Sequence, residues 1–178
     1  MQQLQYNFYH YSDKIIDKLD DRSYKEHRID LEMKIKPRGF WFSVEGIEEP
    51  DNYNWKQWCE AEEFRLEYLR CVHQIHFRED ANILHLKTAD ELIEFSKNYP
   101  VPNERNPWHI ELDASFQLDW LKVKADYQGI IIAPYQWGCR LAIETSWYYG
   151  WDCSSGCVWD LSCIKEFKPV IEKVQKCV

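Results

Sequence analysis

The stretch from Trp147 to Trp159 constrains this chain more than any other part of its sequence. It reads WYYGWDCSSGCVW, so a short segment holds five aromatics, two cysteines, two glycines and one carboxylate. Buried strands are usually built from Val, Ile and Leu, which have no side-chain polar atoms to satisfy. Indole, phenol and carboxylate groups each need a hydrogen-bond partner once they are buried. The segment therefore predicts either a hydrogen-bonded core or the wall of a pocket.

The length and composition indicate one folded unit. The chain has 178 residues, which suffice for one hydrophobic core, and we expect a single domain over residues 1–178. Aromatic residues make up 16% of the sequence, which argues against a disordered chain. The net charge is −8, and the densest basic stretch is Lys34 to Arg38. Such a charge does not predict a strong nucleic-acid footprint.

The cysteines and the hydropathy pattern predict a reducing, cytoplasmic setting. Seven cysteines are scattered without the regular spacing of a secreted disulfide framework. The first residues are polar and aromatic rather than basic and then apolar, so we expect no signal peptide. Because no window approaches the length of an apolar membrane span, we expect no membrane partner.

Apolar periodicity and capping signals predict an α+β fold, because strands and helices follow one another without regular βαβ alternation. Thr88 and Glu91 form a capping box that starts a helix. The expected strands are 4–10, 40–44, 73–78, 82–87 and 130–135, with one or two more in the aromatic segment. The expected helices are a short one after Ser12, then 55–71, 89–98, Asp119 to Gln128, and 161–176 interrupted at Pro169, with loops at 20–36 and 99–107.

A zinc site is one reading of the cysteines. Cys153, Cys157 and Cys163 lie close in sequence, and His73 and His76 could add ligands. Structural zinc sites usually have two Cys-x₂₋₄-Cys pairs, whereas this chain has one Cys-x₃-Cys. We therefore expect no metal site and buried thiols instead.

Two catalytic alternatives have weaker support. Cys139 precedes Arg140, whose charge could lower a thiol pKa, but no catalytic-cysteine signature surrounds it. Carboxylate pairs for hydrolysis could come from Glu144 with Asp152, but nothing in the sequence fixes their separation. The same holds for Glu111 with Asp113.

A fourth group of residues has better support than these three. A strand runs into Phe8-Tyr9-His10-Tyr11-Ser12, a second strand reads from Pro37 through Gly39 to Ser43, and the late aromatic segment carries Asp152. This order resembles the ADP-ribosyltransferase fold in its histidine-containing branch. The phrase WYYGWDCxSGC also resembles segments of uncharacterised bacterial, phage and large-virus proteins, which adds no activity.

The resemblance implies a split β-sheet with flanking helices that binds NAD as substrate. It implies ribose binding by His10, with Tyr11 beside it, and a nicotinamide pocket lined by Ser43. A carboxylate would lower the barrier to the oxocarbenium-like cation that forms when the glycosidic bond of NAD breaks. Asp152 is the first candidate for that role, and Glu144 is the reserve.

A flat nicotinamide ring needs aromatic walls, and Trp41, Tyr148 and Tyr149 are of the right kind. The leading hypothesis is an NAD-dependent ADP-ribosyltransferase that modifies a macromolecular acceptor, either protein or nucleic acid. The alternative is a non-catalytic binding module whose aromatic cleft takes a protein or nucleotide ligand. A toxin or immunity factor in conflict systems is a third reading.

Overall fold

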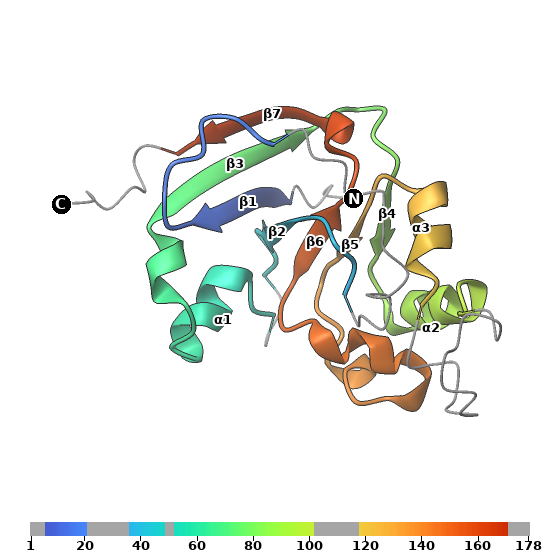
Figure 1. Cartoon of the computed structure of the whole chain (residues 1–178). Coiled ribbons are helices and arrows are strands. Elements are labelled where there is room, and N and C mark those ends of the chain that lie inside the picture. Colours follow the sequence, from blue (N-terminus) through green and yellow to red (C-terminus); the bar gives the residue numbers. More distant parts are fainter. Residues whose placement is uncertain (1–5, 21–35, 49–51, 102–117, 171–178) are drawn as a thin grey trace.

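Seven strands form one mixed sheet in this computed structural model, which describes residues 6–20, 36–48, 52–101 and 118–170 (Figure 1). The strands are β1 (Asn7–Ser12), β2 (Phe40–Glu45), β3 (Cys71–Phe77), β4 (Ile83–Leu86), β5 (Gly129–Ile132), β6 (Ser155–Val158) and β7 (Ile164–Pro169). Their order across the sheet is β4-β5-β6-β2-β1-β3-β7. Only the pair β4–β5 is parallel among these neighbours. With its helices, this sheet makes the fold α+β, as the sequence predicts.

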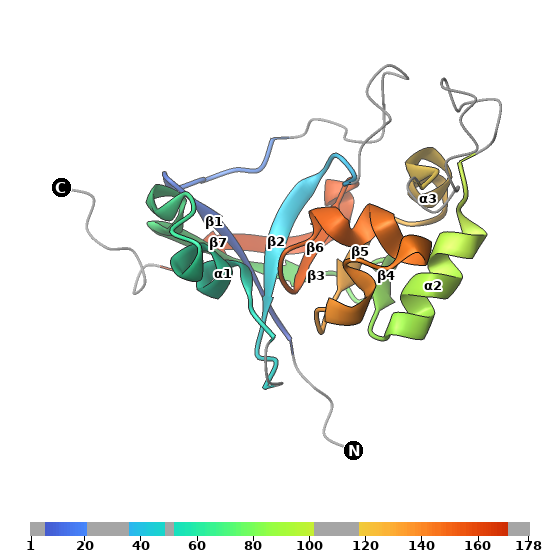
Figure 2. The same ribbon diagram turned by 90° about the horizontal axis from the view of Figure 1, so that it is seen from below.

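The helices lie at opposite ends of the sheet. Helix α1 (Trp55–Ala61) lies near strands β1 and β2, whereas α2 (Ala89–Asn98) and α3 (Trp120–Asp126) lie beside β4 and β5 (Figures 1 and 2). The Thr88 and Glu91 capping box at the start of α2 is present as predicted. Asp119 caps α3 by accepting the N–H of Lys122. Both helix starts were therefore readable from local sequence.

The core has two parts because the sheet buries both faces in its β5 region. Ile130 and Ile132 pack with Leu92, Phe95 and the helices α2 and α3. Ile131, between them, points to the other face and packs in a second cluster. That cluster also contains Phe40, Phe42, Val44 and Ile75. The alternation along β5 thus joins the two halves of the core.

Strands β1 and β2 part in the middle of the sheet. They pair from Asn7–Glu45 to Tyr9–Ser43, where their register ends. β1 continues to pair with β3 through Ser12, and β2 continues to pair with β6 through Phe40. The two halves of the sheet therefore diverge beyond Tyr9 and Ser43.

The aromatic segment is mostly core. Trp147, Tyr148, Trp151 and Trp159 are each 0–1% exposed, and Trp147 Nε1 donates to Ser96 Oγ at 2.7 Å. Residues Ile143–Gly150 form the 3-10 helix η6, and only Ser155–Val158 form a strand. The first reading of the segment, a hydrogen-bonded core, holds for most of it. Its middle part, Asp152 to Ser155, also reaches a pocket, as described below.

The long helix predicted over 55–71 is wrong beyond residue 61. The chain instead turns through Glu63 and Arg65, which have φ angles of 52° and 47°, and continues as the 3-10 helix η2 (Leu66–Leu69). Phe64 N–H donates to Cys59 O at 2.9 Å, which closes α1. Periodicity continued across the turn, but left-handed backbone cannot extend a helix.

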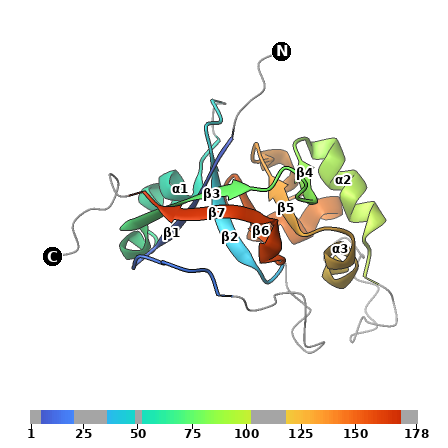
Figure 3. The same ribbon diagram turned by 90° about the horizontal axis from the view of Figure 1, so that it is seen from above.

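Two other predicted helices are also wrong. The helix expected at 161–176 is a short turn η7 (Leu161–Cys163) followed by β7, which runs along β3 (Figure 3). Pairing with β3 and burial of Phe167 override the helical pattern. The helix expected after Ser12 does not form, because Ser12 Oγ donates to Lys14 O and Ile16 N–H donates to His73 Nε2.

Some expectations fall outside the described residues. These are residues 4–5 of the first strand, Glu111 and Asp113, residues 21–35 of the first loop, residues 102–107 of the second loop, and residues 171–176 of the last helix.

Candidate functional site

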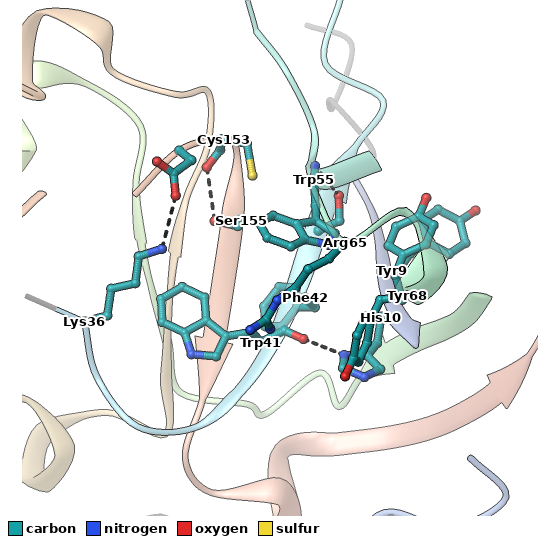
Figure 4. Close-up of a pocket in the computed structure, with 13 residues that line it drawn as sticks. Tyr9, His10, Lys36, Trp41, Phe42, Trp55, Arg65, Tyr68, Cys153 and Ser155 are labelled. Atoms are coloured by element: carbon teal, nitrogen blue, oxygen red, sulfur yellow. Dashed lines mark hydrogen bonds and ion pairs between the residues drawn. The ribbon is translucent and has the colours of Figure 1, made fainter. Parts of the chain in front are cut away.

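A cavity of about 320 Å³ opens where β1 and β2 part (Figure 4). Its size lies at the lower end of the range for small-molecule pockets. β1, β2, the α1–η2 region and the residues around the start of β6 all contribute side chains. The lining residues are Tyr9, His10, Tyr11, Lys36, Trp41, Phe42, Ser43, Trp55, Arg65, Tyr68, Asp152, Cys153 and Ser155.

Five residues that the sequence singled out line this one cavity. They are His10, Tyr11, Trp41, Ser43 and Asp152. They come from three segments that are far apart in sequence, and the parting of the sheet brings them together.

Three other candidates do not line the cavity. Tyr148 is fully buried, and its hydroxyl accepts the N–H of Gln136 at 3.2 Å. Tyr149 is 54% exposed and lies against Arg140, whose guanidinium carbon is 5.5 Å from its ring centroid. Glu144 is exposed near the start of η6. η6 packs against α2, and none of these three residues belongs to the cavity lining.

His10 closes the gap between the parted strands. Its Nδ1 lies 2.8 Å from Trp41 O, and a carbonyl only accepts, so Nδ1 carries the proton. Burial lowers the pKa of His10. The hydrogen bond to the Trp41 carbonyl acts in the opposite direction, and the nearby His73 lowers the pKa further. The ring is therefore neutral near pH 7, with Nε2 as an acceptor. It packs at 4.5 Å between ring centroids on Phe40.

Tyr11 supplies a ring to the cavity, because its hydroxyl is already engaged. That hydroxyl donates to Glu45 Oε1. Burial and the Glu45 carboxylate together raise the pKa of Tyr11, so its phenol stays protonated. A ligand would meet the aromatic face of Tyr11 rather than a phenolate.

Ser43 fixes α1 against the sheet. Its Oγ accepts the backbone N–H of Trp55 at 3.1 Å, just after the capping box formed by Asn54 and Gln57. A hydroxyl has one donor and two acceptor positions, so the Ser43 proton stays available to a ligand. Ser43 thus sets the distance between the β2 and α1 walls of the cavity.

Tryptophans form the aromatic walls. Trp41 packs edge-on against the fully buried Trp151 at 4.8 Å between centroids. Trp55 stacks on Trp58, which does not line the cavity, at 5.3 Å between ring centroids. Each wall residue is held from behind by a second indole, so both rings are fixed before any ligand arrives.

Asp152 is bracketed by two cations. Its Oδ1 lies 3.2 Å from Arg140 Nη2, and its Oδ2 lies 3.5 Å from Lys36 Nζ. Lys36 Nζ also lies 5.2 Å from the centre of the Trp41 ring. The Lys36 pair is long, with both side chains partly exposed, so it contributes little to stability. The carboxylate is therefore near the cavity but its charge is shared.

Sequence reasoning did not predict eight of the lining residues as part of the site: Tyr9, Lys36, Phe42, Trp55, Arg65, Tyr68, Cys153 and Ser155. Lys36 and Arg65 give the cavity two cations against one carboxylate, although the chain as a whole is acidic. The sequence signals for Lys36 were its place in the basic stretch Lys34 to Arg38 and its position just before the second strand. Arg65 had none, because its position depends on the left-handed turn.

The cysteines of the described ranges are buried in the core. Cys59, Cys71, Cys139, Cys153, Cys157 and Cys163 are free and buried. Burial raises the pKa of the Cys153 and Cys163 thiols to about 12. Within the described ranges, no group of three His, Cys, Asp or Glu side chains is arranged to hold a metal ion.

No protein-family model, curated protein or solved structure matches the chain. In the parts that the structure describes, none of the helices has the length and apolar character needed to cross a membrane.

Proposed function

We propose that the protein binds NAD in this cavity and transfers ADP-ribose to a macromolecular acceptor. The observation that supports the proposal most is the convergence of His10, Tyr11, Trp41, Ser43 and Asp152 on one cavity. The parting of β1 and β2 beside His10 supports the split sheet that the resemblance implies.

The chemistry of the lining fits the two halves of the reacting nucleotide. Trp41 offers a fixed aromatic face to a flat nicotinamide, and the Ser43 hydroxyl can donate to its carboxamide oxygen. Neutral His10 would accept from a ribose hydroxyl through Nε2 and hold the sugar in a reactive pose. Breaking the C–N glycosidic bond releases nicotinamide and leaves an oxocarbenium-like cation, which the acceptor's nucleophile then attacks.

Asp152 is the group proposed to stabilise that cation. Its two oxygens are engaged by Arg140 and Lys36, so full stabilisation requires the weaker Lys36 contact to open. This sharing of charge favours a second candidate function, a module that binds NAD without turning it over.

The test is to incubate the purified protein with NAD and follow both nicotinamide release and the thermal unfolding midpoint. An active transferase releases nicotinamide, and Asp152→Asn lowers the rate about 10²-fold while the NAD-induced thermal shift persists. His10→Ala lowers both the rate of nicotinamide release and the NAD-induced thermal shift. Asp80→Asn, an exposed carboxylate paired with Arg78, is the matched control and leaves both unchanged.

Each outcome separates the two candidates. A thermal shift without nicotinamide supports the binding module and removes the transferase. The absence of both removes NAD as a ligand.

A further inference from the structure

We infer that Arg65 and Lys36 form an anion subsite in the cavity, so that its ligand carries a phosphate group bound by the Arg65 guanidinium. The inference rests on the proposed nucleotide pocket and names the chemical group that decides its affinity. Both cations line the cavity. Figure 4 shows Lys36 on one side of Trp41, with the Arg65 side chain extending into the cavity from the other side.

The backbone at Arg65 is held in a costly conformation. Its φ and ψ angles are 47° and 43°, in the left-handed region that side chains other than glycine rarely occupy. The turn is kept in place because Phe64 N–H donates to Cys59 O and Tyr68 N–H donates to Arg65 O, both at 2.9 Å. Strained residues that persist in this way cluster at ligand sites. Here the strained residue, Arg65, is one that lines the cavity.

The Arg65 guanidinium is oriented by aromatic rings rather than by a carboxylate. Its central carbon lies 5.3 Å from the Phe64 ring centroid and 5.6 Å from the Tyr68 ring centroid. Across the described ranges, no carboxylate lies within 4.0 Å of the Arg65 nitrogens as an ion-pair partner. Stacking leaves the donor edge of a guanidinium available, and that edge matches the oxygens of a phosphate in bidentate geometry.

Lys36 is a cation that can exchange its partner. Its contact with Asp152 is 3.5 Å long and partly exposed. A phosphate carries more negative charge than one carboxylate oxygen, so Lys36 can turn to it when the ligand binds. That exchange releases Asp152 Oδ2 while Arg140 still holds Oδ1 at 3.2 Å. Phosphate binding and exposure of the Asp152 charge are therefore coupled.

The experiment measures binding by isothermal titration calorimetry with three probes: nicotinamide mononucleotide, nicotinamide riboside and inorganic pyrophosphate. The first two differ only by a phosphate. The expected result is that wild-type protein binds the mononucleotide about 10- to 100-fold more tightly than the riboside, as a charged hydrogen-bonded contact implies. Arg65→Gln removes that preference without changing the affinity for the riboside, and Arg65→Lys restores part of it.

Arg70→Gln is the matched control, because Arg70 lies in the same turn but outside the lining set. It leaves all three affinities unchanged, and circular dichroism checks that each variant is folded. Equal binding of mononucleotide and riboside by wild-type protein overturns the inference, as does an Arg65→Gln variant that keeps the preference.

The pyrophosphate probe separates this inference from the proposed function. Arg65-dependent binding of pyrophosphate without binding of NAD keeps the subsite and removes the transferase. NAD turnover that is unaffected by Arg65→Gln keeps the transferase and removes the subsite. Absence of binding by all three probes removes the subsite, and absence of NAD binding as well removes the proposed function.

Discussion

The turn after α1 should become more stable when Glu63 is replaced by glycine. Glu63 has φ 52° and directly follows the α1 C-cap, Glu62. Phe64 N–H closes the helix on Cys59 O at 2.9 Å. This is the position at which helices usually place glycine, because glycine adopts left-handed backbone without a steric penalty.

The magnitude follows from two opposing terms. Left-handed backbone costs a residue with a Cβ about 1–2 kcal/mol relative to glycine. Glycine in turn gives the unfolded chain more freedom, which offsets about 0.4–1 kcal/mol. We therefore expect Glu63→Gly to raise the free energy of unfolding by about 0.5–1 kcal/mol. For a domain of this length, the unfolding temperature should rise by about 1–4 °C.

Arg65→Gly relieves the same kind of strain but removes a functional side chain. It loses the contacts with Phe64 and Tyr68, worth about 0.5–1 kcal/mol each at exposed sites, so its stability should stay near that of the wild type. Its affinity for nicotinamide mononucleotide should nevertheless fall about 10- to 100-fold. Glu63→Gly should leave that affinity unchanged.

Urea unfolding followed by circular dichroism measures the stabilities, and calorimetry measures the affinities. A Glu63→Gly variant that is less stable than the wild type would refute the left-handed turn. Equal loss of affinity in both variants would mean that the turn, rather than the guanidinium, governs binding.

Three further perturbations test the packing around the cavity. Gly156→Ala should lower the free energy of unfolding by about 1–3 kcal/mol in urea titrations, because the added Cβ would lie 2.3 Å from Phe42 Cζ. A variant as stable as the wild type would contradict the β2–β6 contact. Ser43→Ala should lower the free energy of unfolding by about 1 kcal/mol, because the Trp55 N–H loses its acceptor. Ser43→Thr keeps a hydroxyl and should leave that free energy unchanged. Burial raises the pKa of the Cys153 thiol to about 12, whereas the pKa of an unfolded thiol is near 9.0. The contribution of this thiol to the free energy of unfolding is therefore complete below pH 9 and declines as the pH rises toward 12. Cys153→Ala should make the fall of stability between pH 9 and 11 shallower by about 1.4 kcal/mol per pH unit, and an unchanged slope would mean that the thiol is not buried.

Local chemistry in the sequence predicted the elements that are fixed locally. The Thr88–Glu91 capping box and the alternation of β1 need only neighbouring residues, and the structure has them where the pattern indicates. The positions of His10, Trp41 and Ser43 on two strands were likewise readable. Their convergence on one cavity required knowledge of how β1 and β2 pair.

Long-range pairing and backbone strain were not readable. β7 is a strand because β3 offers it hydrogen bonds and a place for Phe167, which a helical pattern in 161–176 does not reveal. Arg65 reaches the cavity through a left-handed turn that the local sequence does not predict. Tyr148 looked like a stacking residue, but the fold of η6 buries its ring against Trp151.

The most direct test of the nucleotide pocket is a calorimetric titration of NAD into wild-type protein, Trp41→Ala and Trp137→Ala. Trp41 lines the cavity, and Trp137 is a tryptophan that is 44% exposed outside it. Stacking on Trp41 is worth about 1–3 kcal/mol, so NAD should bind wild-type and Trp137→Ala protein alike and Trp41→Ala at least about fivefold more weakly. Binding that is equal in all three proteins, or no binding to the wild type, would contradict the pocket as the site of NAD.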